Sequence, residues 1–276
     1  MAGDCIEGKK IDLNCSWRVK MKLFINGRAA LNFENLPYSD ALIRGDGAFE
    51  TILVVDKNPI AVDRHLNRLA ESLDGLRINF VNFEGIQEAI SQICSSNIGQ
   101  SKMRLVVLSN SDWFVSLEKL EDSSEPINLT KFEPSIYSQS PLTGIKSTSY
   151  GLSLLARRQI RALGFTDCLF INERGHVVES SFSNLLIQNG SKWLTPALNT
   201  GCLPGIVRGL LIEWFDVEEV EIPYENLFNC EALYLTSSLR LIQRVDRLDN
   251  IDFNVNSIGR GLVTEFRERL MSNINP

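Results

Sequence analysis

The sequence predicts an α+β protein made of two domains. Strand-like and helix-like segments are mixed along its 276 residues, without the regular strand–helix–strand alternation of a doubly wound parallel sheet. At about 100–200 residues per domain, the length fits either one large domain or two modest ones. Between residues 109 and 140 the apolar periodicity fades and Ser, Asp, Glu and Pro accumulate. We therefore expect a small N-terminal α/β domain over residues 21–112, a partly ordered connection over residues 113–140, and a larger C-terminal α/β domain over residues 141–276.

The composition indicates a folded protein without a membrane span. Hydrophobic residues make up 44% of the chain, but no stretch approaches the roughly 18 charge-free apolar residues of a transmembrane helix. There are only two histidines and no Cys-x-x-Cys pair, so we expect no metal centre and reduced thiols, as in a cytoplasmic protein. The net charge of −6 argues against binding to nucleic acid. A small-molecule enzyme fits these features, although an inert binding domain would have the same composition.

The N-terminal half predicts strands and two amphipathic helices. Residues 1–20 are polar and aperiodic, and we expect them to form a flexible extension. A strand beginning at Met21 and ending in an Asn-Gly hairpin turn follows them. Apolar spacing then predicts a strand, two helices and a buried strand, in the order Ala48–Val55, Val62–Leu76, Gly85–Cys94 and Met103–Leu108.

The C-terminal half predicts a helix, three closely spaced strands, a second helix and a last strand. The first helix ends at Gly164, a residue that commonly terminates helices. The expected elements are Leu152–Leu163, Cys168–Asn172, His176–Glu179, Asn184–Gln188, Gly205–Phe215 and Ala232–Thr236. No internal repeat interrupts them.

Three charged residues in these elements have both a structural and a chemical interpretation. Lys146 precedes a helix and follows apolar residues; it is either a surface cation or a desolvated amine able to attack an aldehyde. Glu179 ends a strand; it is either an exposed carboxylate or the partner of a heterocyclic nitrogen. Arg68 lies on the first long helix; it either covers that helix or turns its guanidinium towards a phosphate.

Two further segments could bind an anion. The loop Gly201–Gly205 runs into a helix, whose first N–H groups have no partner within the helix and attract phosphate. Thr236-Ser237-Ser238 offers hydroxyl groups after a strand. Each signal is weak by itself, because glycine and proline at a helix start are ordinary.

Together, and in this order, these segments resemble the class-IV pyridoxal-phosphate aminotransferases of fold type IV. That family includes branched-chain aminotransferases, D-amino acid aminotransferases and aminodeoxychorismate lyases. The resemblance covers about residues 21–245. It is carried by Phe24-Ile25-Asn26-Gly27, Arg44-Gly45-Asp46-Gly47-Ala48-Phe49-Glu50-Thr51, His65-Leu66-Asn67-Arg68-Leu69, Lys146, the block from Gly164 to Asn184, Thr195-Pro196, and Leu203-Pro204-Gly205-Ile206-Val207-Arg208.

The resemblance implies a cofactor, a site and an assembly. Pyridoxal 5′-phosphate would lie between a small and a large domain of a homodimer, in Schiff-base linkage to Lys146, which also moves the substrate's α-proton. Glu179 would pair with the pyridine nitrogen. The phosphate would be held by Arg68, Ile206, Val207 and Ser238. Leu203 would pack on the face of the ring. Tyr150 would contact the ring hydroxyl, or is a core or interface tyrosine.

The substrate class stays open. Arg44 stands where branched-chain enzymes have tyrosine before the glycine, and the Arg-x-His of D-amino acid aminotransferases is replaced by Ser109–Trp113. The Lys-His-x-Asn-Arg of one lyase form is also absent. Arg44 and Arg104 are candidates for binding a substrate carboxylate. The leading hypothesis is amino-group transfer between an amino acid and a 2-oxo acid; the alternatives are 4-amino-4-deoxychorismate lyase and a non-catalytic scaffold relative.

Overall fold

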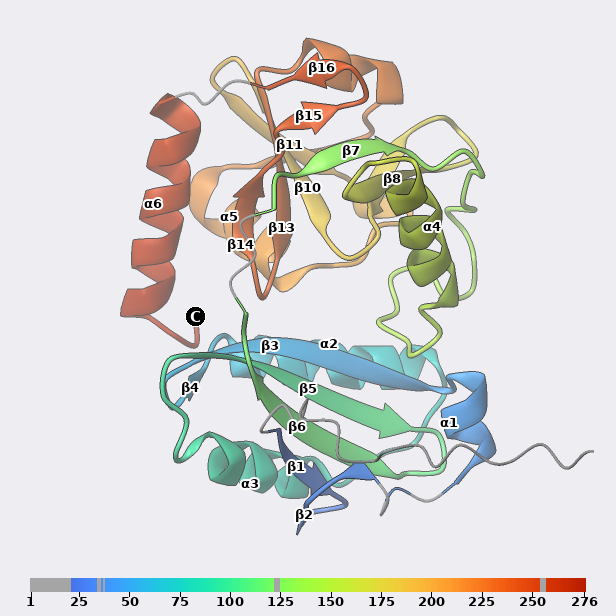
Figure 1. The fold of residues 1–276 in the computed structure, drawn as a ribbon, viewed down its shortest axis with the longest axis vertical. Coiled ribbons are helices and arrows are strands. Elements are labelled where there is room, and N and C mark those ends of the chain that lie inside the picture. The colour runs from blue at the N-terminus through green and yellow to red at the C-terminus, as the bar shows by residue number, and fades with distance from the viewer. Residues whose placement is uncertain (1–20, 34–35, 37, 122–124, 254–256) are drawn as a thin grey trace, which may run out of the picture.

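The computed structural model describes residues 21–276 except 34–35, 37, 122–124 and 254–256. The predicted extension over residues 1–20 lies outside the described residues. Figure 1 shows the molecule in two parts: the lower part is a sheet packed with two long helices, and the upper part is a larger group of strands and helices. The mixture of antiparallel sheets and helices confirms the predicted α+β class. No helix in the described part of the chain is long and apolar enough to cross a membrane.

The lower part consists of the first nine elements. They are β1 Lys22–Ile25, β2 Arg28–Ala30, α1 Asp40–Arg44, β3 Gly47–Val55, β4 Asn58–Pro59, α2 Val62–Gly75, α3 Phe83–Cys94, β5 Gln100–Leu108 and β6 Trp113–Lys119. The strands form one sheet in the order β2-β1-β6-β5-β3-β4, with every neighbouring pair antiparallel. Helices α2 and α3 pack on one face of the sheet and close the first hydrophobic core.

The opposite face of this sheet contributes to the site. Strand β3 is buried on both faces: Ile52 points into the core under α2 and α3, whereas Leu53 packs into a core of the upper part. Phe49 belongs to a further small apolar cluster with Val106. A strand buried on both sides reads as a continuous apolar run, which is the pattern of Ala48–Val55 apart from the charged Glu50 and the polar Thr51.

The upper part contains two five-stranded sheets. Its elements are β7 Asn128–Lys131, α4 Gly151–Ala162, β8 Asp167–Ile171, β9 Val177–Ser180, β10 Asn184–Asn189, β11 Lys192–Pro196, η2 Leu198–Thr200, α5 Ile206–Phe215, β12 Glu218–Val220, η3 Tyr224–Asn229, β13 Ala232–Ser237, β14 Leu241–Arg244, β15 Arg247–Leu248, β16 Ile251–Asp252 and α6 Ser257–Ser272. The strand orders are β12-β11-β10-β13-β14 and β16-β15-β7-β8-β9. One core fills the space between the sheets, while α5 and α6 cover the first sheet and α4 packs on the second.

The predicted connection over residues 113–140 is more ordered than its composition suggested. Strand β6 belongs to the lower sheet, and β7 belongs to an upper one. Trp113, Val115 and Leu117 alternate into the first core, a period-two pattern that the flanking Ser and Asp residues obscured. Helix α6, which we also did not predict, buries Leu262, Phe266 and Leu270 on one side.

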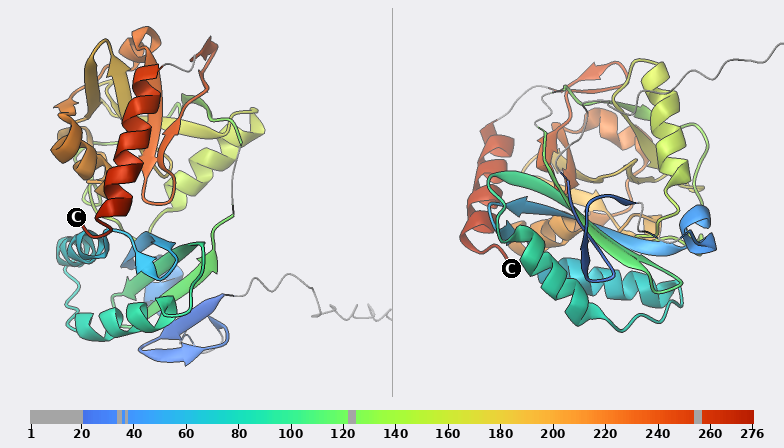
Figure 2. Two further views of the ribbon diagram at one scale, coloured as in Figure 1. Left: turned by 90° about the vertical axis from the view of Figure 1, so that its left-hand side faces the viewer. Right: turned by 60° about the horizontal axis from the view of Figure 1, so that its bottom comes forward.

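The two parts are tied together by the C-terminal tail. The Ala61 N–H donates to the Ile274 carbonyl (2.6 Å), and Arg64 Nε donates to the Pro276 carbonyl (2.7 Å). Arg64 also forms a two-pronged ion pair with Glu213 on α5 (2.7 and 2.8 Å). Figure 2 shows that α6 leads the chain end down to the lower sheet. These contacts hold α2 against the upper part and so set the width of the space between them.

Candidate active site

A cavity of about 680 Å³ lies between the lower sheet and the upper part. Strands β3 and β5 supply one wall, and β9, β10, the start of α5 and the turn after β13 supply the other. Nine of the ten predicted site residues line it: Arg68, Arg104, Lys146, Tyr150, Glu179, Leu203, Ile206, Val207 and Ser238. These residues come from six separate stretches of sequence, so the fold brings together what the motifs only suggested.

Lys146 is fixed to the lower sheet although it follows the connection in sequence. Its carbonyl accepts from the Phe49 N–H (3.0 Å), and Ser147 forms a β-bridge with Ala48. Its own N–H donates to Ser72 Oγ on α2 (3.2 Å). Burial, followed by the positive charge of Arg68, lowers the pKa of the Lys146 ammonium to about 8. The backbone is therefore held in place, and a larger fraction of the amine is neutral at physiological pH than for an ordinary lysine, although most of it stays protonated.

Two aromatic rings surround the amine. Lys146 Nζ lies 4.5 Å from the centre of the Phe49 ring and donates to Tyr150 Oη (3.4 Å). The Phe49 and Tyr150 rings meet edge to face at 5.0 Å. Burial raises the pKa of Tyr150, so its hydroxyl stays protonated. A protonated phenol can donate a hydrogen bond to an oxygen placed next to Lys146.

Glu179 lies on the upper wall with its carboxylate in the cavity. Glu179 Oε2 accepts from Asn184 Nδ2 and from the Leu203 N–H, both at 3.1 Å. Burial raises the pKa of Glu179 to about 7, and the Leu203 N–H opposes that rise. A carboxylate with this pKa can share a proton with a weakly basic ring nitrogen. Asn184 also donates to the Leu203 carbonyl (2.9 Å), so one amide aligns both groups.

Arg68 is aligned by a buried carboxylate that we did not predict. Arg68 Nε and Nη2 donate to the two oxygens of Glu50 (2.8 and 2.7 Å), and Nη1 donates to the Pro204 carbonyl (3.0 Å). His65 Nδ1 lies 2.6 Å from Glu50 Oε2. These ionic contacts hold the pKa of Glu50 far below its usual value despite complete burial. A guanidinium has five N–H donors, so two of Arg68 are left for an anion.

The start of α5 and the turn after β13 form an anion cradle beside Arg68. Helix α5 begins at Ile206 without a side-chain cap, so its first N–H groups face the cavity without a helical acceptor. Thr236 Oγ1 is buried with no hydrogen-bond partner among the described residues, and Ser238 lines the same space. A Cβ at Gly205 would collide with Asn184 Oδ1. Uncapped N–H groups, hydroxyls and a guanidinium together suit a phosphate group.

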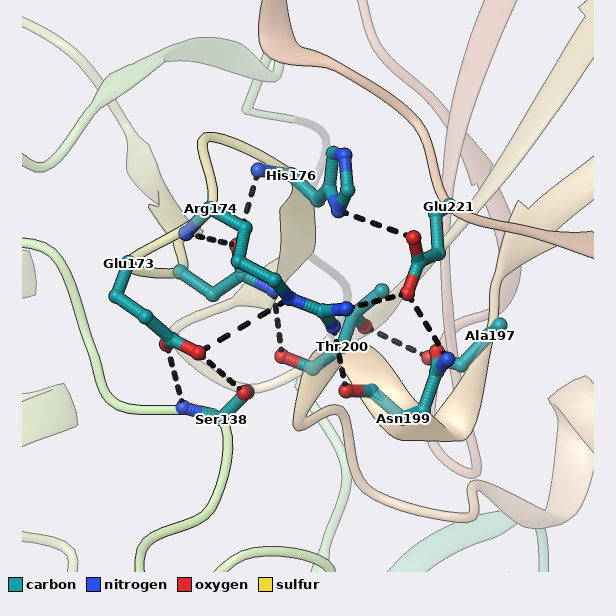
Figure 3. A network of polar contacts seen from close by, with 9 residues as sticks. Ser138, Glu173, Arg174, His176, Ala197, Asn199, Thr200 and Glu221 are labelled. Carbon is teal, nitrogen blue, oxygen red and sulfur yellow. Dashed lines mark hydrogen bonds and ion pairs between the residues drawn. The ribbon is translucent and has the colours of Figure 1, made fainter.

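A polar network behind the cavity anchors its loops (Figure 3). Arg174, between β8 and β9, donates to Glu221 Oε1 (2.8 Å) and to the Asn199 carbonyl (2.9 Å). Asn199 Nδ2 donates to the same Glu221 oxygen (2.9 Å). Glu173 accepts from the N–H and the hydroxyl of Ser138 (2.8 and 2.6 Å). The hairpin that carries the cavity carboxylate is thereby linked to the loop before α5.

The two predicted carboxylate-binding arginines have different positions. Arg104, on β5, lines the cavity with its guanidinium carbon 5.2 Å from the centre of the Phe49 ring. Burial lowers its pKa. Arg44 does not line the cavity: it ends α1, its side chain is 76% exposed, and it pairs with Asp40 at 3.7 Å. The left-handed Gly45 terminates α1 and leaves Arg44 facing solvent.

Sequence reasoning missed two residues that organise the site, Glu50 and Asn184, and gave Thr236 only as one of three hydroxyl-bearing residues after a strand. Glu50 had a usable signal, since a lone charge in an otherwise apolar buried strand requires a partner. Asn184 and Thr236 are ordinary polar residues at strand ends. Their roles arise only because β10 pairs with β13, which places Asn184 opposite Thr236.

Residues 47–248 match the model of the family described as amino-transferase class IV. The chain belongs to this family. It is 24% identical over 261 residues to the aminodeoxychorismate lyase of Bacillus subtilis, covering 85% of this chain and 89% of that protein. It is 28% identical over 244 residues to a probable branched-chain-amino-acid aminotransferase of Thermotoga maritima, covering 83% and 85%.

The fold agrees with solved structures of this family. A hypothetical aminotransferase from Mycobacterium tuberculosis, in its PLP-bound form, superimposes with a TM-score of 0.83 at 22% identity, covering 92% of this chain and 99% of that one. The predicted resemblance to fold-type IV is thus confirmed, and the chain is an enzyme of the class-IV family, which depends on pyridoxal phosphate. Its individual reaction is a separate question.

Proposed function

We propose that this enzyme uses pyridoxal phosphate to transfer an amino group between an amino acid and a 2-oxo acid. The observation that carries the proposal is the position of Lys146 Nζ. This desolvated amine, with a pKa of about 8, shares one cavity with the Glu179 carboxylate and the anion cradle of α5. A surface cation would have neither the burial nor these neighbours.

The cavity residues fit the cofactor. Arg68, Ser238 and the N–H groups of Ile206 and Val207 would hold its phosphate, and Thr236 Oγ1, which has no partner among the described residues, would supply a further donor. The contacts to the pyridine ring would come from Glu179 at the nitrogen, Leu203 on the face and Tyr150 at the hydroxyl. When bound, the cofactor withdraws electrons from the substrate's Cα and makes its proton acidic.

The protein's own groups then move that proton and orient the substrate. Lys146 Nζ takes the proton from Cα as a general base and returns it as a general acid, a role that suits a pKa near the working pH. Phe49 and Tyr150 restrict the amine from two sides. Arg104 binds a substrate carboxylate and fixes which face of Cα meets Lys146.

A second candidate is the elimination of pyruvate from 4-amino-4-deoxychorismate, which leaves 4-aminobenzoate. The likeness to the Bacillus subtilis lyase favours it, and the same lysine would serve as its base. An assay without a 2-oxo acid separates the two reactions. Pyruvate released from aminodeoxychorismate alone identifies the lyase, whereas turnover that requires a 2-oxo acid identifies the aminotransferase.

The Lys146→Ala variant is the control for both assays. It should abolish either reaction, because the other lysine that lines the cavity in the described part of the chain, Lys102, is paired with Glu118 at 2.9 Å. A wild-type protein that takes up no pyridoxal phosphate and turns over neither substrate would instead support the scaffold alternative.

We also propose that the enzyme is a homodimer. Helix α4 exposes Leu152, Leu154 and Leu155 by 44–50%, and nearby α1 exposes Ile43 by 64%. Ser149 Oγ donates to the Gly45 carbonyl (2.8 Å), which places the end of α1 beside the start of α4. Apolar side chains gathered on two adjoining helices are typical of a protein interface. Sedimentation equilibrium should give twice the mass of one chain; a monomer at micromolar concentration would contradict the proposal.

A further inference from the structure

The cavity carries more positive charge than the proposed cofactor needs. In a chain with a net charge of −6, three arginines line the cavity outside the phosphate cradle: Arg104, Arg157 and Arg240. Arg104 already has a proposed role. Arg157 extends from α4, and Arg240 follows β13, so these two come from elements that lie far apart in the sequence.

Neither Arg157 nor Arg240 has an anionic partner within the described structure. Arg157 Nε is buried without a hydrogen-bond acceptor, and Arg240 donates its backbone N–H to Ser237 Oγ (3.4 Å). The carboxylates of Asp167 and Glu125 oppose the fall in the pKa of Arg240, but neither forms an ion pair with Arg240 in the described structure. Asp167 Oδ1 accepts from the Ser181 hydroxyl (2.5 Å) and the Cys168 N–H (2.8 Å), and Glu125 pairs with Arg161 (2.9 Å).

The two guanidinium groups also affect each other electrostatically. The pKa of Arg240 is lowered first by burial and then by the charge of Arg157. Two partly buried like charges repel, and a bound anion removes that cost. This pair therefore has the chemistry of a carboxylate site, since guanidinium donors match the two oxygens of a carboxylate.

A row of aromatic rings connects this pair to the reacting end of the cavity. Arg104 lies over Phe49 (5.2 Å), and Phe49 meets Tyr150 at 5.0 Å. Tyr150 stacks on Phe182 at 5.9 Å with an interplanar angle of 12°. Arg157 lies over Phe182 at 5.4 Å. The cavity wall is thus aromatic along its length, with a guanidinium at each end and Lys146 beside the first two rings.

We propose that Arg157 and Arg240 bind a second carboxylate of the substrate, at the end of the aromatic row away from Lys146. This inference rests on the proposed function and narrows its substrate to amines with two carboxylates separated by an apolar or planar body. One carboxylate would meet Arg104 near the reacting carbon, the body would pack on Tyr150 and Phe182, and the other would reach the arginine pair.

A titration with unreactive dicarboxylates tests this second site. Straight-chain α,ω-dicarboxylates of five to ten carbons, each with its matched monocarboxylate, are titrated into the holoenzyme and into the cofactor-free protein by calorimetry. For the wild type we expect tighter binding of dicarboxylates, with an optimum at one chain length. Arg157→Gln and Arg240→Gln should each weaken the best dicarboxylate about ten- to a hundredfold and leave the monocarboxylates unchanged.

Two control variants make the result specific. Arg158→Gln changes the exposed neighbour on the same helix and should alter neither series. Arg157→Lys keeps the charge and should retain much of the preference for dicarboxylates over monocarboxylates. It also provides a result if the Arg157→Gln variant does not fold. Equal affinity for both series in the wild type, or equal losses for both in the variants, would overturn the second site. Failure to take up pyridoxal phosphate would instead refute the proposed function. The absorbance of the protein reports this uptake independently of the calorimetric titration.

Discussion

Replacing Glu50 by glutamine should destabilise the protein strongly, because it removes the only carboxylate that contacts Arg68 within the described structure. Both side chains are buried: Glu50 is 0% and Arg68 6% exposed. A glutamine would present an NH₂ group to donors of Arg68 that now meet a carboxylate oxygen. Removing one partner of a buried ion pair costs about 3–5 kcal/mol. For a chain of 276 residues, that corresponds to a fall in Tm of about 5–9 °C.

Glu118→Gln is the matched control for this change. Glu118 pairs with Lys102 at 2.9 Å, but the side chains are 31% and 26% exposed, and pairs of that kind contribute less than about 1 kcal/mol. Urea unfolding of both variants, without cofactor and at pH 7, gives the comparison. If Glu50→Gln costs no more than Glu118→Gln, Glu50 does not compensate the charge of Arg68, and our account of the phosphate side of the site is wrong.

The Glu50 variant should also respond differently to acid and to the cofactor. Ionic contacts lower the folded-state pKa of Glu50, so its contribution is fully present above the unfolded-state pKa of about 4.3. That contribution is lost as the pH falls through the folded-state value. The gap in stability between wild type and variant should therefore narrow in acid. A bound phosphate beside Arg68 would restore a negative charge, so the gap should also be smaller in the holoenzyme.

Three further changes test the other parts of the site. Lys146→Met should raise the unfolding free energy of the cofactor-free protein at pH 7 by about 1–3 kcal/mol. The stability of the wild type rises with pH between the folded pKa of Lys146, about 8, and the unfolded pKa of about 10.4, so the advantage of the variant should shrink by pH 10. A variant less stable than the wild type at both pH values would count against a desolvated lysine. Glu179 has a folded pKa of about 7, so the stability of the wild type falls as the pH rises from about 4.3 to 7. In urea unfolding, the free energy of unfolding of Glu179→Gln relative to wild type should therefore increase between pH 5 and pH 8. Gly205→Ala should lower the unfolding free energy by about 1–3 kcal/mol through the collision with Asn184, and it should weaken pyridoxal phosphate binding. Gly209→Ala, whose Cβ meets nothing within 4 Å, should be neutral or stabilising. Equal effects of the two changes would contradict the phosphate-binding role of the anion cradle.

The residues of the site that the sequence could reveal belong to local motifs. Lys146, Glu179 and the loop leading into α5 each have a residue type and a neighbourhood typical of their chemistry, and their order along the chain carries the family resemblance. The fold class followed from the same local patterns, because strand and helix periodicities differ. Strand β6 was missed only because its short alternating pattern lies among Ser and Asp residues.

The remaining parts of the site depend on contacts between distant segments. Glu50 meets Arg68 because α2 packs on β3, and Arg157 approaches Arg240 only when α4 and the turn after β13 reach the same cavity. Arg44 illustrates the opposite case. Its place beside a glycine turn suggested a substrate contact, but α1 ends there and leaves the side chain in solvent. Pairing and packing of this kind leave no local pattern to detect.

The most direct test of our account is to locate the lysine that carries the cofactor. The holoenzyme is reduced with borohydride, digested, and analysed by mass spectrometry. Of the ten lysines in the chain, only Lys146 should carry the reduced pyridoxyl phosphate, and the yellow absorbance should disappear on reduction. A label on any other lysine, or an unlabelled protein, would contradict the site proposed for this enzyme.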